Sequence, residues 1–403
     1  MSNQNNESRS SLRGFATRAV HAGERIPGPV GVPTSTPVYA ATSYLHEDMG
    51  TLDAVLGGEE PGYAYSRFGN PTTRALEIAI ASLEGTEEAV AFASGMAALH
   101  AAVLNEVKQG STIVAAIDLY GATANLLTTI FEPMGVKTVF VNTCDLNEVQ
   151  SAVLAHRPRA VLVETISNPL MRVANLPELV AIAHSNRAAV ICDNTFASPA
   201  LVNPASFGVD TVVHSTTKYL AGHGDVTGGV IATTADRAFE IMELLKLVGG
   251  VPGPFESWLT LRGLKTLPLR VRQQSDNAGA IAAHLSHHHQ VEAVYWPGFA
   301  DDSASTVFHS HMRGGMVAFE LRNRGRREVF RFLEALEVIL PGTTLGDVYS
   351  QALYPPISSH RGMDPAELAA KGLHDGLIRI SAGIEDIADL IADLDQALSA
   401  ATG

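Results

Sequence analysis

The sequence predicts an α/β fold in which a mostly parallel sheet carries helices on both faces, followed by a smaller C-terminal α/β unit. From about residue 66 to 258, short runs of β-branched and other apolar residues alternate with segments of helical period. Most of these runs are continuously apolar rather than alternating, as expected of strands that are buried on both faces of a parallel sheet. Helices must then cover both faces of the sheet.

The strands predicted in the first unit are short and separated by helical stretches. They lie at residues 111–118, 136–142, 160–166, 189–193, 211–215 and 229–232. Before them, residues 31–60 are rich in Pro, Gly and Thr without a clear period, which favours an extended arm that lies on a neighbouring subunit. Residues 1–13 are polar and rich in Asn and Ser, and we expect them to form a disordered tail.

The pattern changes after residue 258. The elements expected in the second unit are an amphipathic helix, a strand, a second helix, a second strand and a final helix, at residues 269–285, 315–321, 327–339, 377–381 and from 386 onward. A second α/β unit of this length lies within the usual size range of a domain. We therefore expect a large domain followed by a C-terminal domain.

The composition restricts the class of partner. The 403 residues are 46% hydrophobic and 17% charged, and the formal net charge is −14. Nucleic acids and anionic membranes are polyanions, so this charge predicts a small-molecule partner instead. The two cysteines, Cys144 and Cys192, support neither a disulfide framework nor a cysteine metal site. No apolar stretch approaches the roughly 20 residues that span a bilayer, and we expect a cytoplasmic protein.

One lysine lies in a distinctive setting. Lys218 follows the hydroxyl residues Ser215 and Thr217, and Asp193 ends the preceding apolar strand. An aldehyde cofactor that carries a phosphate and a ring nitrogen needs an amine for a Schiff base, phosphate donors and an acidic partner for the nitrogen. The sequence therefore predicts pyridoxal phosphate (PLP) bound through Lys218. Lys265 is the main rival, but it lacks the hydroxyl pair and the acidic strand partner.

Asp193 and three other candidate residues at the ends of predicted strands and helices could each also have a purely structural role. Asp193 alone would more often be a helix N-cap, but its pairing with Lys218 favours the ring nitrogen. Gly95 begins an Ala-rich helix, where free amides could bind a phosphate or the glycine could only cap the helix. Tyr120 follows a strand and could stack on a ring and shuttle a proton, or be a half-buried aromatic. Asn168 could point its amide toward the same edge of the predicted sheet as these strand ends, or form a turn before Pro169.

Two arginines could bind anionic groups. Arg67 lies in a polar and aromatic cluster on the arm and can grip a phosphate bidentately. Arg379 is a cation inside an apolar strand, where it needs a partner, either a substrate carboxylate or a structural salt bridge. The run of histidines at residues 287–289 lacks ligand spacing, so we predict no metal site.

Together these segments resemble the Cys/Met-metabolism family of PLP enzymes, which includes cystathionine γ-synthase, cystathionine γ-lyase and methionine γ-lyase. The resemblance runs from about Thr17 to the end of the chain. Its motifs are Tyr-Ser-Arg-x-x-Asn-Pro-Thr, Ser-Gly-Met, Tyr-Gly-x-Thr, Asp-Asn-Thr, His-Ser-x-Thr-Lys-Tyr and Leu-Arg-Gly-Leu-Lys-Thr-Leu. It implies the type I fold of PLP-dependent transferases and a homotetramer of two tight dimers whose active sites are shared between subunits.

The resemblance also implies roles for individual residues. Lys218 resembles the lysine that binds the cofactor aldehyde, and Tyr120 the stacking residue and proton donor. Asp193 resembles the partner of the ring nitrogen, Asn168 a contact of the ring oxygen and the substrate, and Arg379 the carboxylate-binding arginine. The phosphate ligands would be Gly95, Met96, Ser215 and Thr217 from one subunit, and Tyr65 and Arg67 from the other. The expected domains are residues 1–65 as tail and arm, 66–258 as the cofactor-binding domain and 259–403 as the C-terminal domain.

Departures from the family pattern concern the substrate. Thr344 stands where relatives carry serine, and we expect Thr343, Thr344 and Tyr349 to contact the substrate. Thr343 replaces the glutamate of typical cystathionine γ-lyases, and Ala122 the cysteine of typical methionine γ-lyases.

The expected reaction is γ-elimination on a γ-substituted L-amino acid, releasing 2-oxobutyrate or a related product. The substrate would be methionine, cystathionine or a γ-oxygen analogue such as canavanine or an acylated homoserine. The alternative is γ-replacement, as in cystathionine γ-synthase or O-acylhomoserine sulfhydrylase. A non-catalytic scaffold is disfavoured because every cofactor position is filled.

Overall fold

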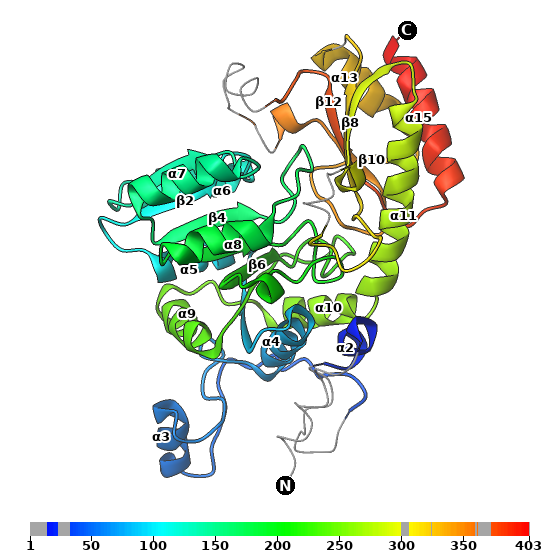
Figure 1. Cartoon of the computed structure of the whole chain (residues 1–403). Coiled ribbons are helices and arrows are strands. Elements are labelled where there is room, and N and C mark those ends of the chain that lie inside the picture. Colours follow the sequence, from blue (N-terminus) through cyan, green and yellow to red (C-terminus); the bar gives the residue numbers. More distant parts are fainter. Residues whose placement is uncertain are drawn as a thin grey trace.

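The computed structural model describes residues 14–22, 33–299, 306–323, 325–358, 361 and 372–402. The tail predicted at residues 1–13 lies outside the described residues, as does the part of the predicted arm before residue 33. The described chain forms two sheets, each with its own helices (Figure 1). The expected fold class, a mostly parallel sheet with helices and a second, smaller sheet unit, is confirmed.

The large sheet has the strand order β1-β7-β6-β5-β4-β2-β3. Its central strands β6, β5, β4, β2 and β3 pair in parallel, while β7 runs antiparallel to both β6 and β1. The strands are β1 (Glu88–Phe92), β2 (Thr112–Ala116), β3 (Lys137–Val141), β4 (Ala160–Glu164), β5 (Ala189–Asp193), β6 (Thr211–Ser215) and β7 (Gly229–Thr233). The sequence analysis located six of these strands and missed β1.

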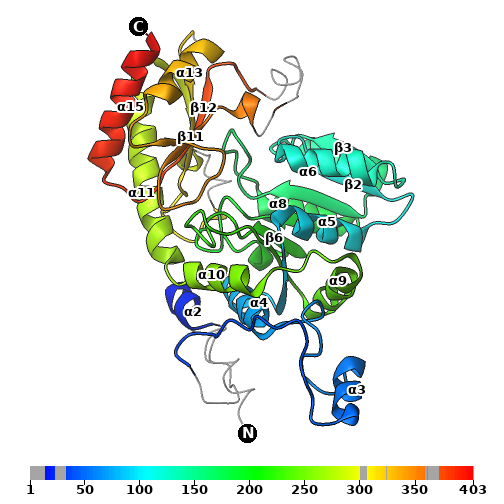
Figure 2. The same cartoon turned by 180° about the vertical axis from the view of Figure 1, so that it is seen from behind.

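Helices cover both faces of this sheet (Figures 1 and 2). Val190 and Cys192 of β5 belong to one hydrophobic core and Ile191 to the other, because side chains alternate along a strand. The first core packs under α4 (Pro71–Glu84), α7 (Leu146–His156) and α8 (Leu176–Ser185). The second packs under α5 (Gly95–Glu106), α9 (Ala235–Val248) and the residues after α6 (Gly121–Leu126).

The small sheet has the strand order β10-β11-β12-β9-β8. Its strands are β8 (Val291–Tyr295), β9 (Met316–Leu321), β10 (Leu340–Pro341), β11 (Gln351–Leu353) and β12 (Leu377–Ser381). The helices α11 (Leu267–Ser286), α13 (Arg326–Ala335) and α15 (Ile387–Thr402) pack with it around a third core. The proposed domain boundary after residue 258 falls inside α10 (Pro254–Leu264).

One predicted helix end was wrong. The helix expected at residues 327–339 stops at Ala335, because the Asp393 carboxylate of α15 accepts the backbone N–H groups of Glu337, Val338 and Ile339 at 2.9, 3.0 and 2.8 Å. These contacts turn the backbone away from the helix and toward β10. Short helical turns occur elsewhere, at Leu127–Phe131, Pro204–Phe207, Pro297–Phe299 and Pro355–Ile357.

The predicted arm is not extended throughout. Helix α3 (Met49–Gly57) interrupts it, with Asp48 as N-cap accepting the Thr51 N–H at 2.8 Å and Gly58 ending the helix at a φ of 76°. The helix buries none of its residues and lies apart from the rest of the chain (Figures 1 and 2). In contrast, α2 (Phe15–His21) packs against α4 and α11. No helix in the described part of the chain is long and apolar enough to cross a membrane.

Candidate active site

A cavity of about 610 Å³ lies where the carboxyl ends of β4, β5 and β6 face residues of the small sheet unit. Open α/β sheets bind their ligands at this edge, because the loops that follow parallel strands meet there. Most of the predicted site residues line this cavity: Gly95, Met96, Tyr120, Asn168, Asp193, Ser215, Thr217, Lys218, Thr343, Thr344 and Arg379.

Lys218 lies in the turn that follows β6, and its side chain is mostly buried. Its amine donates a hydrogen bond of 2.8 Å to Thr344 Oγ1. Burial and the charge of Arg379 lower the pKa of Lys218 to about 8, while Asp347 opposes this effect. A substantial fraction of this amine is therefore uncharged near neutral pH, the form that attacks an aldehyde.

Asp193 ends β5 and is joined to β6 through Thr195. Asp193 Oδ1 accepts the Thr195 N–H at 2.9 Å, and Thr195 Oγ1 accepts the Ser215 N–H at 2.9 Å. Burial raises the pKa of Asp193, while the hydrogen bonds from Thr195 and the nearby His214 favour the ionised carboxylate. Thr195 lines the cavity and was not among the predicted site residues, although the Asp-Asn-Thr motif contained it.

The N-terminus of α5 lines the cavity beside Ser215. Ser94 caps the helix by accepting the Ala97 N–H at 3.1 Å, so the N–H groups of Gly95 and Met96 have no acceptor within the helix. A Cβ atom at Gly95 would lie 2.8 Å from Ser215 Cβ, so only glycine allows this close approach of α5 and β6. Free amides beside hydroxyl groups can bind a phosphate.

Glu164 is a second acidic residue of the cavity that the sequence analysis missed. It ends β4 directly beside Asp193 in the parallel register, and its Oε1 accepts the Tyr120 N–H at 2.6 Å. Burial and the neighbouring Asp193 raise the pKa of Glu164 well above its usual range. The signal that could have identified it is a glutamate at the end of the apolar run 160–164. Tyr120 itself is 42% exposed at the mouth of the cavity.

Arg379 reaches the cavity from β12. Its Nη1 donates to Asn168 Oδ1 at 3.0 Å and its Nη2 to the carbonyl oxygen of Thr344 at 3.3 Å. Burial lowers the pKa of Arg379 to about 10. No carboxylate among the described residues forms an ion pair with it, which favours the carboxylate of a ligand over a structural salt bridge.

Three predicted site residues do not line this cavity. Tyr65 is 39% exposed on the arm, and Arg67 donates to the carbonyl oxygen of Lys246 while its guanidinium lies 4.8 Å from the Phe68 ring centre. Tyr349 packs its hydroxyl against Gly224, where a Cβ atom would come within 2.0 Å of it. The structure thus brings together the expected residues of the two sheet units except Tyr349, and does not add those of the arm.

The donor set of the cavity fits PLP. Lys218 provides a mostly buried amine of lowered pKa, Asp193 a partly buried acid, and α5 unpaired amides for a phosphate. Residues 16–399 match the family model described as Cys/Met metabolism PLP-dependent enzyme. The chain belongs to this family. Its cofactor is therefore PLP, and the sequence-based identification of the family and cofactor is confirmed.

Relatives in this PLP-dependent family include both synthases and lyases. The chain is 39% identical to cystathionine γ-synthase of Mycobacterium tuberculosis, over 96% of this chain and 97% of that protein. It is 37% identical to L-methionine γ-lyase of Pseudomonas putida, over 97% and 98%. The structure of cystathionine γ-synthase from Xanthomonas oryzae pv. oryzae in complex with cystathionine has a TM-score of 0.90 and 35% identity, covering 97% of this chain and 99% of that one. The protein is a PLP-dependent lyase or transsulfuration enzyme of cysteine and methionine metabolism.

Proposed function

We propose that this enzyme catalyses γ-elimination on an L-amino acid with an uncharged γ-substituent, such as methionine or an O-acylhomoserine, and releases 2-oxobutyrate. The observation that carries the proposal is the charge of the cavity lining. Its charged side chains among the described residues are Glu164, Asp193, Lys218 and Arg379. Lys218 and Asp193 serve the cofactor, Arg379 serves the substrate's α-carboxylate, and Glu164, whose pKa is raised well above its usual range, accepts the Tyr120 N–H. No cation of this lining therefore remains for a carboxylate at the far end of a substrate.

The proposed roles follow from the positions of these side chains. PLP, when bound, supplies an aldehyde for an amine and a ring that accepts electrons from the Cα–H bond. Arg379 binds the substrate's α-carboxylate, and Asn168 keeps the guanidinium oriented through its 3.0 Å contact. Lys218 Nζ, oriented by Thr344, takes the proton from Cα. Asp193 would bind the ring nitrogen of PLP, and Tyr120 would stack on its ring; both side chains line the cavity.

The second half of the reaction requires acid catalysis at the γ-position. Once Lys218 Nζ has given up the Cα proton, it takes a second proton from Cβ. One of the two protons leaves with the γ-substituent, donated by Lys218 Nζ or the Tyr120 hydroxyl, and the other returns to the four-carbon chain, from which water releases 2-oxobutyrate and ammonia. Lys218 and Tyr120 line the same cavity. The proposed phosphate ligands are the amides of Gly95 and Met96 and the hydroxyls of Ser215 and Thr217. We propose that Thr343 and Thr344 contact the substrate, whereas Tyr349, which packs against Gly224 outside the cavity lining, has no proposed role.

γ-Replacement is the second candidate, because the 39% identical relative is named a cystathionine γ-synthase. Replacement by cysteine would require the cavity to hold a second charged amino acid beside the first. The lining leaves no spare cation for its carboxylate, which supports elimination, or replacement by a small uncharged thiol.

The test is to incubate the purified holoenzyme with L-methionine, O-acetyl-L-homoserine and L-cystathionine, each with and without cysteine or methanethiol, and to identify products by NMR. We expect 2-oxobutyrate from methionine or O-acetylhomoserine without any thiol. If 2-oxobutyrate forms from none of the substrates unless a thiol is present, the elimination proposal is wrong. If cystathionine is the best substrate, the inference of an uncharged γ-substituent is wrong.

We further propose that Tyr65 and Arg67 complete the cavity of a partner subunit in a homotetramer. Supporting this, the arm carries exposed apolar side chains, among them Leu45, which is fully exposed. Mixing Arg67→Ala subunits with Lys218→Ala subunits tests the proposal, because one site of each mixed pair then contains both native residues. Recovery of activity supports shared sites, and no recovery in verified mixed oligomers contradicts them. We also propose a cytoplasmic location, which is supported by two cysteines that form no disulfide.

A further inference from the structure

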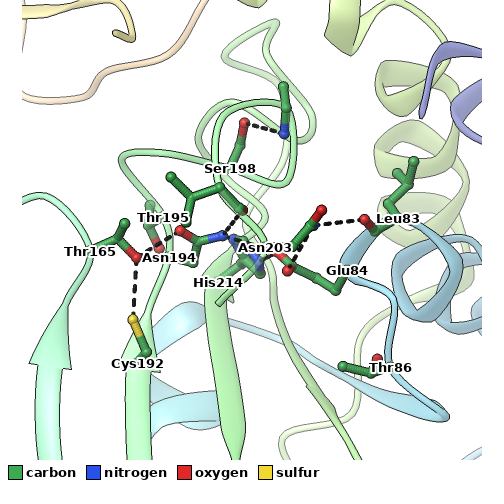
Figure 3. Close-up of polar contacts among 12 residues, drawn as sticks. Leu83, Glu84, Thr86, Thr165, Cys192, Asn194, Thr195, Ser198, Asn203 and His214 are labelled. Atoms are coloured by element: carbon green, nitrogen blue, oxygen red, sulfur yellow. Dashed lines mark hydrogen bonds and ion pairs between the residues drawn. The ribbon is translucent and has the colours of Figure 1, made fainter. Parts of the chain in front are cut away.

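Figure 3 shows a cluster of mostly buried polar side chains. It lies on the face of the large sheet opposite to the cofactor cavity. Neighbouring residues of a strand point to opposite faces, so His214 points away from the side on which Ser215 lines the cavity. Cys192 likewise belongs to the core under α4 and α8, whereas Ile191 packs under α5. We call this set the Glu84 cluster: Glu84, Thr165, Cys192, Asn194, Asn203 and His214.

The centre of the Glu84 cluster is a contact of 2.6 Å between Glu84 Oε1 and His214 Nε2, whose side chains are 0% and 1% exposed. Asn194 donates to the same carboxylate oxygen at 3.1 Å, and Asn203 donates to the other oxygen at 3.3 Å. His214 Nδ1 has no hydrogen-bond partner among the described residues. Glu84 is therefore the only hydrogen-bond partner of the imidazole ring among the described residues.

The cluster also joins three neighbouring strand ends. Asn194 Oδ1 accepts the Thr165 hydroxyl at 2.7 Å, and this hydroxyl contacts Cys192 Sγ at 3.2 Å (Figure 3). Thr165 follows the last residue of β4, Asn194 follows β5, and His214 lies in β6. A buried carboxylate is costly unless donors satisfy it, so replacing Glu84 or its donors would disturb the relative positions of these ends.

Each member at a strand end is adjacent in sequence to a residue that lines the cavity. Asn194 lies between Asp193 and Thr195, and His214 precedes Ser215. On the cavity side, the Ser215 N–H binds Thr195 Oγ1 and the Thr195 N–H binds Asp193 Oδ1, each at 2.9 Å. The Glu84 cluster therefore holds from behind the two strand ends that carry the proposed ring partner and a proposed phosphate ligand.

We propose that Glu84 and His214 are positioning residues for the cofactor, which set the spacing between Asp193 and Ser215 and thereby the affinity for PLP. The proposal rests on the PLP site and not on the γ-elimination reaction. The competing interpretation is that the pair only stabilises the fold, as many buried polar contacts do.

The charged groups around the pair allow a second measurement. Arg18 of α2 and His309 interact electrostatically with Glu84, and Asp193 interacts electrostatically with His214. His214 favours the ionised form of Asp193. Removing His214 should therefore change the pH dependence of the visible absorbance of bound PLP, because Asp193 is the proposed partner of the ring nitrogen.

The variants are Glu84→Gln, His214→Leu and His214→Gln. Gln at position 214 retains an N–H donor that can reach Glu84, whereas Leu leaves the buried carboxylate without it. The matched control is Glu77→Gln in the same helix, because Glu77 is also a buried glutamate and accepts the Ala91 N–H at 3.1 Å away from the cavity.

For each apo-protein, the dissociation constant of PLP and the melting temperature are measured, followed by the pH profile of the holoenzyme's absorbance. We expect Glu84→Gln and His214→Leu to weaken PLP binding by about tenfold or more, His214→Gln to recover most of that loss, and Glu77→Gln to change affinity by less than about twofold.

The proposal is overturned if Glu84→Gln weakens PLP binding no more than Glu77→Gln does, or if His214→Leu keeps the wild-type affinity and pH profile. If His214→Leu does not fold, the comparison of Glu84→Gln with Glu77→Gln decides. Because no substrate enters these measurements, failure of the proposed γ-elimination would leave the outcome unaffected.

Discussion

Replacing Arg379 by Gln should move the titration of the Lys218 amine to higher pH, and replacing Asp347 by Asn should move it to lower pH. Burial and Arg379 lower the pKa of Lys218 from 10.5 to about 8, and Asp347 raises it. Removing the positive charge of Arg379 therefore raises the pKa of Lys218, and removing the negative charge of Asp347 lowers it. Thr344 places the amine close to the guanidinium, since its hydroxyl binds Lys218 and its carbonyl oxygen binds Arg379.

The size of the effect follows from the fraction of uncharged amine. At about pH 7.5, a pKa of about 8 leaves roughly a quarter of the Lys218 amines uncharged, against about one in a thousand for an ordinary lysine. Removing one nearby charge shifts a pKa by about one pH unit. The Arg379→Gln substitution should then reduce the uncharged fraction at this pH by about eightfold.

The assay follows the capture of an aldehyde by the apo-protein. Apo-protein is mixed with pyridoxal, which lacks the phosphate, and the initial rate of absorbance change is measured by stopped flow across pH. The wild-type midpoint should lie near pH 8, with the two variants displaced in opposite directions. Arg322→Gln, in the small sheet unit and outside the cavity lining, is the control and should leave the midpoint unchanged. Shifts of the same sign in both variants, or none, would refute the reasoning.

Three further predictions concern packing and the cavity. Gly95→Ala should weaken PLP retention during dialysis by about tenfold or more, since the added methyl meets Ser215 Cβ at 2.8 Å; unchanged retention would contradict the close approach. Glu164→Gln should keep the circular dichroism of bound PLP, because the amide oxygen can still accept the Tyr120 N–H, whereas Glu164→Ala should diminish it; equal spectra for both would exclude a positioning role. Phe332→Ala should lower the free energy of unfolding by about 3–5 kcal/mol in urea, without changing PLP affinity.

The strands predicted from continuous apolar runs agree with the structure where the pattern is local. Residues 189–193, 211–215 and 377–381 are strands with these bounds. The sequence analysis missed β1 in the large sheet and β8, β10 and β11 in the small one; β10 and β11 have only two and three residues, too few to show a period. Contacts from distant parts of the chain stabilise such segments, so their sequence alone carries little signal.

The candidate site likewise contains residues that the sequence pattern indicates and residues that only contacts in the folded chain indicate. Lys218, Asp193 and Gly95 could be predicted because each follows or ends a recognisable element, and elements of a parallel sheet expose their ends at one edge. Glu164 ends an apolar run, as Asp193 does, but its contact with Tyr120 appears only in the folded chain. Thr195 could not be separated from ordinary residues, because its importance lies in contacts with Asp193 and Ser215. Helix α3 within the arm was missed because residues 31–60 show no period as a whole, although Asp48 and Gly58 are ordinary helix signals.

The sequence by itself determined the family, the cofactor and the α/β architecture, because these depend on residue types at fixed spacing along the chain. The tertiary structure decided which charges face one another. It placed Arg379 against Asn168 and Thr344 with no carboxylate partner among the described residues, and it set Glu164 beside Asp193. The pKa of Lys218 depends on burial and on charges far away in the sequence, so only the folded chain determines it.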